Sequence, residues 1–411
     1  MKREELDGHL LVLVTLGLVA FGLVMVYSAT SAQAAIGDGD PGSYLKRQGT
    51  YALIGLVLLI AASRADFRRL RHLGGVLVAV SLVLCLAVLV LGDPINGARR
   101  WLSLGPAVFQ PSELAKLSLA IWAAAYLARR RPPASLGELL RPLGLVAGAF
   151  CVLLLAEPDL GTTIALVFML FGILLVAGTR ARVLVSAGVF VVAAGLAAIW
   201  LEPYRRARVL SFLNPWDDAQ GAGFQTVQAM IGLGSGGAFG VGLGEGVQKI
   251  NYLPEAHTDM ILAVIGEELG LVGISVVIAA YAVFAYAALR IALRCRDPFG
   301  KRLAAGLATL VCAQAAINLA AVLGLAPLTG IPLPFLSYGG SNLVVALTSV
   351  GILLNIAGNR GQERAAQVPD RSRRNRRPRA AVAGGRRGAE RARSRRDLRR
   401  VAEPHGSAAR S

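Results

Sequence analysis

The chain has 411 residues, of which 55% are hydrophobic and only 17% are charged, and its formal net charge is +18. Soluble globular domains are usually about 25% charged, so this composition excludes an ordinary soluble domain and indicates a membrane protein. Residues 359–411 hold 17 Arg against 5 Asp or Glu, and this concentration of charge in one tail argues against a nucleic-acid-binding surface. The four cysteines and four histidines are scattered, which favours neither an extracytoplasmic disulfide nor a His-rich metal centre.

Apolar stretches recur along the chain, many of them about 20 residues long, which is enough to cross a hydrocarbon core. The first resembles a signal peptide after Lys2 and Arg3, but it is longer than a cleaved apolar region of about 7–15 residues, so we interpret it as a retained span. The sequence predicts an all-α, polytopic integral membrane protein with about ten transmembrane helices. They cover residues 10–30, 50–63, 73–92, 112–128, 143–156, 160–178, 183–200, 260–289, 303–325 and 341–357.

Arginine-rich segments follow the second, fourth, sixth, eighth and tenth predicted spans. The positive-inside rule makes that side cytoplasmic, so both termini are predicted to be cytoplasmic. Residues 1–360 then form a membrane domain with a long extracytoplasmic loop over about 201–258. Residues 361–411 are predicted to be a disordered, Arg-rich cytoplasmic tail, which either lies at anionic lipid headgroups or docks an acidic partner. Some basic residues oppose this rule and are candidates for binding an anion: Lys46, Arg47, Arg99, Arg100, Arg205, Arg206 and Arg208.

The segment NGARRWLSLGPAVFQPSELAKLSLAIW places Arg100 just before a predicted helix that contains Glu113 and Lys116. Glu113 and Lys116 are three residues apart and share one helix face, so a structural salt bridge explains them, as does an anion-binding site. An interfacial anchor would explain the Arg-Arg-Trp run equally well. In EPDLGT, Glu157 and Asp159 interrupt apolar sequence, and a tight turn accounts for them without any chemical role.

Eight glycines fall between Gly232 and Gly246 in the long extracytoplasmic loop. Their backbone amides would suit a phosphate group, but the run matches no nucleotide-binding spacing and a flexible loop fits it as well.

The stretch YLPEAHTDMILAVIGEELG places Asp259 in the predicted first helical turn, with His257 before it and Glu267 and Glu268 two turns later. A carboxylate there can simply cap the helix, which stabilises it by about 0.3–1 kcal/mol. It can act as a base only if desolvation, a cation or the transition state helps it. Glu267 and Glu268 require either a water-filled cavity or cationic partners, for which the extracytoplasmic Arg and Lys are candidates.

Three prolines and a Gly pair in APLTGIPLPFLSYGGSNLVVAL predict an irregular segment at a span boundary. Irregular backbone at membrane depth is tolerated where it lines a cavity or is buried in protein. The hydrogen-bonding side chains there favour a hydrophilic pocket over mere helix packing: Ser337, Tyr338, Ser341 and Asn342.

Together these stretches resemble the SEDS family of polytopic peptidoglycan glycosyltransferases, represented by FtsW in division and RodA in elongation. The resemblance covers about residues 8–360 and is carried in order by GARRW with QPSELAK, EPDLGT, YLPEAHTD with GEELG, and PLPFLSYGGS. GVGLGEGVQK, PEAHTD and IGEELG are similar to the FtsW branch, while RodA-type sequences more often have Arg at the position of Ala256. Phe224 stands where the family usually has Tyr, so we assign no hydroxyl role there.

The resemblance implies that the 4-hydroxyl of one lipid II attacks the anomeric carbon of the growing glycan strand and releases undecaprenyl pyrophosphate. It implies Asp259 as the catalytic carboxylate and Arg100 and Lys116 as cations for the pyrophosphate, with Glu113 orienting Lys116. Ser337, Tyr338 and Ser341 would contact substrate. A supporting role in the cavity is expected for His257, Glu267, Glu268, Glu157 and Asp159.

The resemblance further implies a class B penicillin-binding protein and other divisome proteins as partners, in the bacterial inner membrane and at the division septum. A divalent cation such as Mg²⁺ or Mn²⁺ is compatible with it, although the sequence shows no ligand cluster, and no organic cofactor is expected. Membrane lipid is an expected contact and nucleic acid is not. A lipid II flippase, an elongation-type polymerase and a scaffold that only recruits a partner remain alternatives.

Overall fold

The structure is a computed structural model that describes residues 3–36, 40–95, 97–105, 107–250 and 252–367. Most of the predicted disordered tail, residues 368–411, lies outside the described residues. The final helix continues to Gln367.

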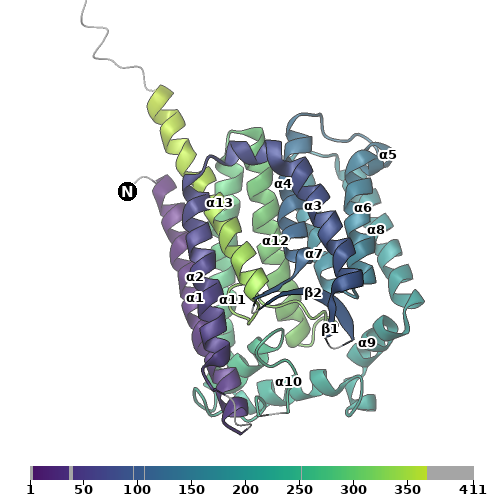
Figure 1. Cartoon of the computed structure of the whole chain (residues 1–411), viewed down its shortest axis with the longest axis vertical. Helices are drawn as coiled ribbons and strands as arrows, with labels where there is room; N and C mark the ends of the chain where they lie inside the picture. Colours follow the sequence, from purple (N-terminus) through teal and green to yellow (C-terminus); the bar gives the residue numbers. More distant parts are fainter. Residues whose placement is uncertain (1–2, 37–39, 96, 106, 251, 368–411) are drawn as a thin grey trace, which may run out of the picture. The chain divides into compact units, whose positions relative to one another are not determined.

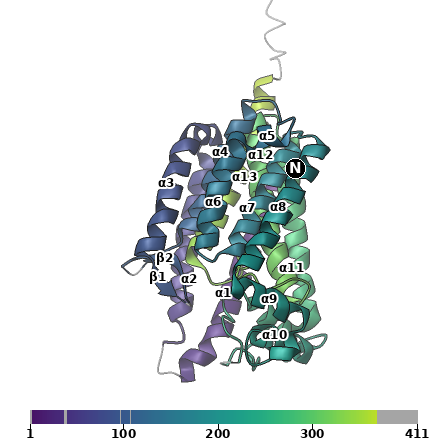
Figure 2. The ribbon, with the colours of Figure 1, turned by 90° about the vertical axis from the view of Figure 1, so that its right-hand side faces the viewer.

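All ten predicted spans are helices, so the prediction of an all-α polytopic membrane protein is confirmed (Figures 1 and 2). Eight described spans are long and apolar enough to cross a membrane; α7 is shorter, and α4 carries Glu113 and Lys116. The helices are α1 (Arg3–Ile36), α2 (Ser43–Arg64), α3 (Leu70–Leu91), α4 (Pro111–Ala128), α5 (Leu136–Leu139) with α6 (Leu145–Ala156), α7 (Leu160–Val176), α8 (Ala181–Leu201), α11 (Ile261–Arg294), α12 (Pro298–Val322) and α13 (Gly340–Gln367).

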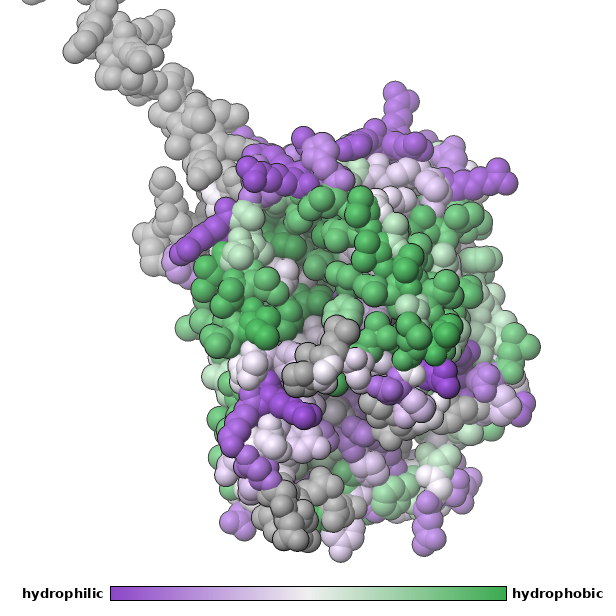
Figure 3. All heavy atoms as spheres, in the orientation of Figure 1, coloured by the Kyte–Doolittle hydropathy of each residue, from purple (hydrophilic) through white to green (hydrophobic). Residues whose placement is uncertain are grey.

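The helices alternate in direction, so the arginine-rich connections gather at the end where α1 begins. Asp7 near the start of α1 accepts a hydrogen bond from Arg294 at the end of α11, 2.7 Å away, which fixes these two helix ends together. A broad hydrophobic belt separates two hydrophilic rims on the visible face (Figure 3). This distribution is that of a multi-pass membrane protein.

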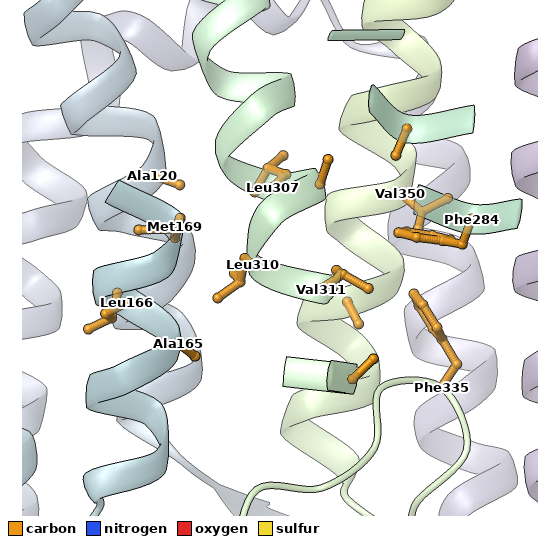
Figure 4. Close-up of a cluster of buried hydrophobic side chains, with 14 of the residues drawn as sticks. Ala120, Ala165, Leu166, Met169, Phe284, Leu307, Leu310, Val311, Phe335 and Val350 are labelled. Carbon is orange, nitrogen blue, oxygen red and sulfur yellow. The ribbon is translucent and has the colours of Figure 1, made fainter. Parts of the chain in front are cut away.

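Helices α12 and α13 form the centre of the bundle, with 61% of their span residues buried against 11% for α8. Leu307, Leu310 and Val311 of α12 pack in a hydrophobic cluster with Met169 of α7 and Phe284 of α11 (Figure 4). Small residues allow the close approach: a Cβ at Gly172 of α7 would lie 2.2 Å from the Thr309 hydroxyl of α12. Such small-residue contacts let membrane helices pack without large side chains between them.

Three short strands precede α4 and were not predicted. They are β1 (Asp93–Ile95), β2 (Ala98–Leu104) and β3 (Ala107–Phe109), antiparallel in the order β1-β2-β3. The long segment between α8 and α11 also contains two unpredicted helices, α9 (Pro203–Leu213) and α10 (Phe224–Gly236), and a short 3₁₀ turn at Pro215–Asp218. The sheet, α9 and α10 lie at the end of the bundle opposite the start of α1 (Figure 1).

Candidate active site

Asp259 lies in a series of turns from residue 252 to 260, immediately before α11. The predicted position in the first helical turn is therefore wrong by two residues. The residue before the helix is Met260, and it makes no side-chain cap hydrogen bond. Asp259 therefore does not cap α11, because the N-cap position is occupied by Met260 and helix capping cannot explain the carboxylate.

Asn318 of α12 fixes the backbone at Asp259. Its amide nitrogen donates to the carbonyl oxygens of Asp259 (2.7 Å) and Ile331 (2.8 Å), and the residue is 2% exposed. Ile331 belongs to the irregular loop between α12 and α13, which the sequence predicted. A Cβ at Gly330 of this loop would lie 3.9 Å from Oδ2 of Asp259, so the carboxylate faces the loop.

Burial and, to a smaller extent, the negative charge of Glu255 raise the pKa of Asp259 to about 6. A hydrogen bond from Thr258 and the positive charge of Arg208 act in the opposite direction. A carboxyl group with this pKa is a better proton acceptor than an ordinary Asp and is still ionised at neutral pH.

Three arginines from separate elements lie around the turn at Pro158 and the loop at Leu328. Arg100 on β2 donates to the carbonyl oxygens of Glu157 (2.9 Å) and Pro158. Arg205 on α9 donates to the carbonyl oxygen of Leu155, at 2.6 Å, and Arg208 donates to that of Leu328, at 3.3 Å. These acceptors are neutral, so the bonds hold the guanidinium groups in place without cancelling their charge.

An apolar cavity of about 760 Å³ begins beside two of these arginines and extends among the membrane helices. Arg205 and Arg208 line it together with Pro158 and Leu328, and most of the remaining lining is aliphatic residues of α7, α11 and α12. The cavity therefore combines a long hydrophobic compartment with a cationic end, and Arg208 connects that end to Asp259.

Glu113 and Lys116 form the expected ion pair, with Oε1 and Nζ 2.7 Å apart and side chains 3% and 1% exposed. Asn342 of α13 donates a further hydrogen bond to Glu113. In the described part of the chain, no hydrogen bond or ion pair joins Asp259 to Lys116 or to Arg100. Lys116 stays a predicted pyrophosphate ligand, and the cation that acts on Asp259 is Arg208.

Glu267 and Glu268 hold the Gly-rich loop against α11. Glu268 pairs with Lys249 at 2.6 Å, and both are almost fully buried; Ser28 of α1 also donates to Glu268. Of the two alternatives for Glu268, a cationic partner or a water-filled cavity, the structure shows the cationic partner. Glu267 instead accepts hydrogen bonds from the backbone amides of Val247 (2.8 Å) and Gln248 (3.2 Å). These amides thus bind an internal carboxylate, in a loop whose amides were expected to suit a phosphate.

The remaining predicted site residues connect loops around Asp259. The His257 ring lies edge-on to Tyr44, with centroids 4.9 Å apart, and 5.4 Å from Tyr338, and burial lowers the pKa of His257. Ser337 accepts from the amide of Leu333 within its own loop. Ser341 joins α13 to the chain leading into α4, because its hydroxyl accepts from the amide of Gln110.

Glu157 and Asp159 occupy the turn between α6 and α7. Asp159 accepts a hydrogen bond from the amide of Thr162 at 3.0 Å and so caps α7, a structural role that the sequence had not assigned to it. Glu157 is fully buried, and burial with the nearby charge of Asp159 raises its pKa to about 8. Glu157 touches the site through its carbonyl oxygen, which Arg100 binds.

No group of three or more His, Cys, Asp or Glu residues that could hold a metal ion occurs among the described residues. The carboxylates of Asp259 and Glu255 share the Thr258 hydroxyl, from which their oxygens lie 3.2 and 2.9 Å away. Mg²⁺ is often held by one or two carboxylates together with substrate phosphates. This pair fits such a shared arrangement and does not supply a complete set of ligands by itself.

A family model described as "Cell cycle protein", covering FtsW, RodA and SpoVE, matches residues 8–362. The chain belongs to this family. It is 41% identical over 362 residues to the probable peptidoglycan glycosyltransferase FtsW of Geobacter sulfurreducens, covering 87% of this chain and 96% of the relative. It is 37% identical to the stage V sporulation protein E of Bacillus subtilis, covering 85% and 96%.

Two solved structures support the same assignment to the FtsW/RodA/SpoVE family. A chain from a study of how a peptidoglycan synthase complex coordinates polymerization and crosslinking is 33% identical, with a TM-score of 0.72, and covers 86% of this chain and 98% of that chain. The rod shape determining protein RodA of Thermus thermophilus is 31% identical, with a TM-score of 0.63, and covers 85% and 96%.

Sequence reasoning missed two residues that this family member brings to Asp259. Arg208 could be recognised as a candidate anion-binding residue, because the positive-inside rule expects few basic residues on its side of the membrane. Nothing in the sequence placed it near Asp259. Asn318 could not be recognised, because a single Asn in an Ala-rich helix shows its role only when the partner carbonyls of Asp259 and Ile331 are known.

Proposed function

We propose that this protein is a peptidoglycan glycosyltransferase that polymerises lipid II into β-1,4-linked glycan strands during cell division. The observation that carries the proposal is a half-buried carboxylate, Asp259, next to the cationic end of an apolar cavity of about 760 Å³. The names of the relatives, most of them FtsW glycosyltransferases, support the division-type reaction.

In the proposed reaction, Asp259 accepts the proton of the acceptor 4-hydroxyl as its oxygen attacks the anomeric carbon. The bond from that carbon to the pyrophosphate oxygen breaks, and undecaprenyl pyrophosphate leaves with the electron pair. Since a pyrophosphate leaving group needs little protonation, one carboxylate suffices, whereas a glycosidase uses two.

Arg208 and Arg205 are the groups we assign to the departing diphosphate, because they line the cavity at its cationic end. Arg100 lies on the other side of the Pro158 turn and adds positive charge there. The aliphatic cavity suits a polyprenyl chain. A divalent cation shared between Asp259, Glu255 and substrate phosphates would add further charge to the leaving group.

Polymerisation by detergent-solubilised protein, purified with its transpeptidase partner, tests the proposal. The substrate is lipid II, and the product is glycan chains resolved by electrophoresis. A flippase would use the same cations but makes no glycan in detergent, where there is no membrane to cross. Absence of polymer from a complex that still binds lipid II would favour the flippase.

We further propose that the chain acts with a class B penicillin-binding protein and other divisome proteins at the septum. A chain similar to this one belongs to a peptidoglycan synthase complex, which supports such a partner. A fluorescent fusion at midcell is the expected localisation. Uniform side-wall fluorescence would favour an elongation-type polymerase.

The pH dependence of polymerisation should follow Asp259. Its pKa of about 6 means that the carboxylate is ionised above pH 6 and protonated below it. We expect kcat/KM to fall about tenfold per pH unit below about pH 6, since only the ionised form accepts the proton. A rate profile that stays flat to pH 5 would contradict the role of Asp259 as base.

Arg208→Ala should lower kcat/KM by about a hundredfold, the loss typical for one charge-stabilising donor. Because Arg208 holds the pKa of Asp259 down, its removal should also move the acid limb of the rate profile to higher pH. Arg206→Ala is the matched control, since Arg206 is an exposed residue of the same helix and does not line the cavity. Equal losses in both variants would indicate a general effect of charge on α9.

A further inference from the structure

A small basic pocket lies between the start of α3 and the end of α4, at the opposite end of the bundle from Asp259. These helices lie side by side (Figure 1). The pocket has a volume of about 360 Å³, and we call it the α3–α4 pocket. Its lining includes Arg71, His72, Gly75, Tyr126, Arg129 and Arg130. Nothing in the proposed glycosyl transfer uses it.

Three arginines and a histidine converge on this pocket, and its lining includes no Asp or Glu among the described residues. Arg130 is positioned by Tyr126, with a hydrogen bond of 2.8 Å to the hydroxyl and the guanidinium 4.6 Å from the ring centroid. Arg71 donates to Nε2 of His72 at 3.2 Å. The described lining thus carries three positive charges and no negative one, so an anion in the pocket would be stabilising.

An apolar stripe continues from the pocket along the outer face of α3. Its side chains recur at helical spacing and are 45–71% exposed: Leu73, Val76, Val80, Val83, Leu86 and Val90. An exposed apolar stripe on a peripheral membrane helix faces lipid chains. The pocket and the stripe together fit a molecule with a negatively charged head and hydrocarbon tails.

We propose that the α3–α4 pocket binds the phosphate headgroup of an anionic phospholipid from the cytoplasmic leaflet, with its acyl chains along α3. Basic pockets between membrane helices on the cytoplasmic side recognise such headgroups. Arg71, Arg129 and Arg130 bind the phosphate oxygens, and the Tyr126 hydroxyl closes one side of the site.

Two adjacent glycines explain why the pocket is open. A Cβ at Gly74 would lie 3.1 Å from the Cα of Trp122, so Gly74 lets α3 and α4 approach closely. A Cβ at Gly75 would meet nothing within 4 Å, so Gly75 faces the empty space. Gly75→Leu therefore fills the pocket without changing its charge.

Native mass spectrometry of the full chain tests the proposal. The protein is titrated with phosphatidylglycerol and phosphatidylcholine of identical acyl chains, at an ionic strength high enough to screen the Arg-rich tail. We expect the first phosphatidylglycerol to bind at least about thirtyfold more tightly than phosphatidylcholine, as two or three arginines near the surface would give. Arg71→Ala/Arg129→Ala and Gly75→Leu should each reduce that preference to near parity.

The control is Arg180→Ala/Arg182→Ala, which removes two exposed arginines from the start of α8 at the same end of the bundle. It should keep the preference. Equal loss in the control would mean that the charged rim, and not the pocket, attracts the lipid, and would overturn the proposal. Full retention in Gly75→Leu would also overturn it. So would tighter binding of undecaprenyl pyrophosphate with the same variant sensitivity, because the pocket would then serve the substrate lipid.

Discussion

Asp259→Ala is expected to abolish polymerisation of lipid II, with a loss of at least about a hundredfold in kcat. The variant removes the proton acceptor but leaves the backbone bond from Asn318 to the Asp259 carbonyl oxygen in place. Membrane insertion and partner binding should therefore be unchanged. The measurement is the rate of glycan formation by the purified complex. Asp259→Asn, which keeps the side-chain shape, should lose as much.

The neighbouring carboxylate provides the control for this prediction. Glu255 raises the pKa of Asp259, so Glu255→Gln should retain most activity and move the acid limb of the rate profile to lower pH. Full activity in Asp259→Asn would end the assignment of a base to this position. Comparable inactivation by Glu255→Gln would show that the two carboxylates act as a unit, for instance through a shared cation.

Lys249→Met should destabilise the protein strongly, because it leaves Glu268 buried without its cation. Removing one partner of a buried ion pair typically costs about 3–5 kcal/mol. We expect a fall of several degrees in the Tm measured in detergent. Lys249→Met/Glu268→Gln should recover most of the loss, since it removes the stranded charge and keeps the hydrogen bond from Ser28 possible.

An exposed ion pair between a lysine and an aspartate offers a control for the buried Lys249–Glu268 pair. Lys46 and Asp40 are also 2.6 Å apart, but their side chains are 74% and 54% exposed. Exposed pairs contribute little because water screens them. Lys46→Met should leave the Tm unchanged, and a fall as large as that of Lys249→Met would contradict the explanation by burial.

Hydropathy and charge were sufficient to predict the membrane architecture. Each of the ten spans is a separate apolar run, and the Arg-rich connections alternate with them, so both signals are local. The short sheet at residues 93–109 was missed because two of its strands have three residues, too few to show an alternating pattern. Helix α9 was missed because its arginines make it too polar to appear as an apolar span.

The site was predictable in its residue types and less so in its contacts. Glu113 and Lys116 are close in sequence, and their ion pair follows from helix geometry. The contact between Ser28 and Glu268 spans 240 residues, and no local pattern encodes it. Arg208 likewise reaches Asp259 only because α9 folds back over the end of the bundle. The sequence thus indicated which residue types form the site, but not which residues from distant parts of the chain contact one another.

Asn318 has a mechanical consequence. Its side-chain nitrogen is engaged by two carbonyl groups, one on each of the segments that enclose the Asp259 carboxylate. Separating these segments would leave the buried Asn318 amide without an acceptor, so we expect the two segments to move together as one rigid body, which forms one wall of the site. We expect room for a bulky disaccharide to come from the facing wall, where Arg205 and Arg208 of α9 bind backbone carbonyl oxygens of neighbouring segments. The reaction chamber thus has a fixed side that carries the base and an adjustable side that carries the charge for the leaving group.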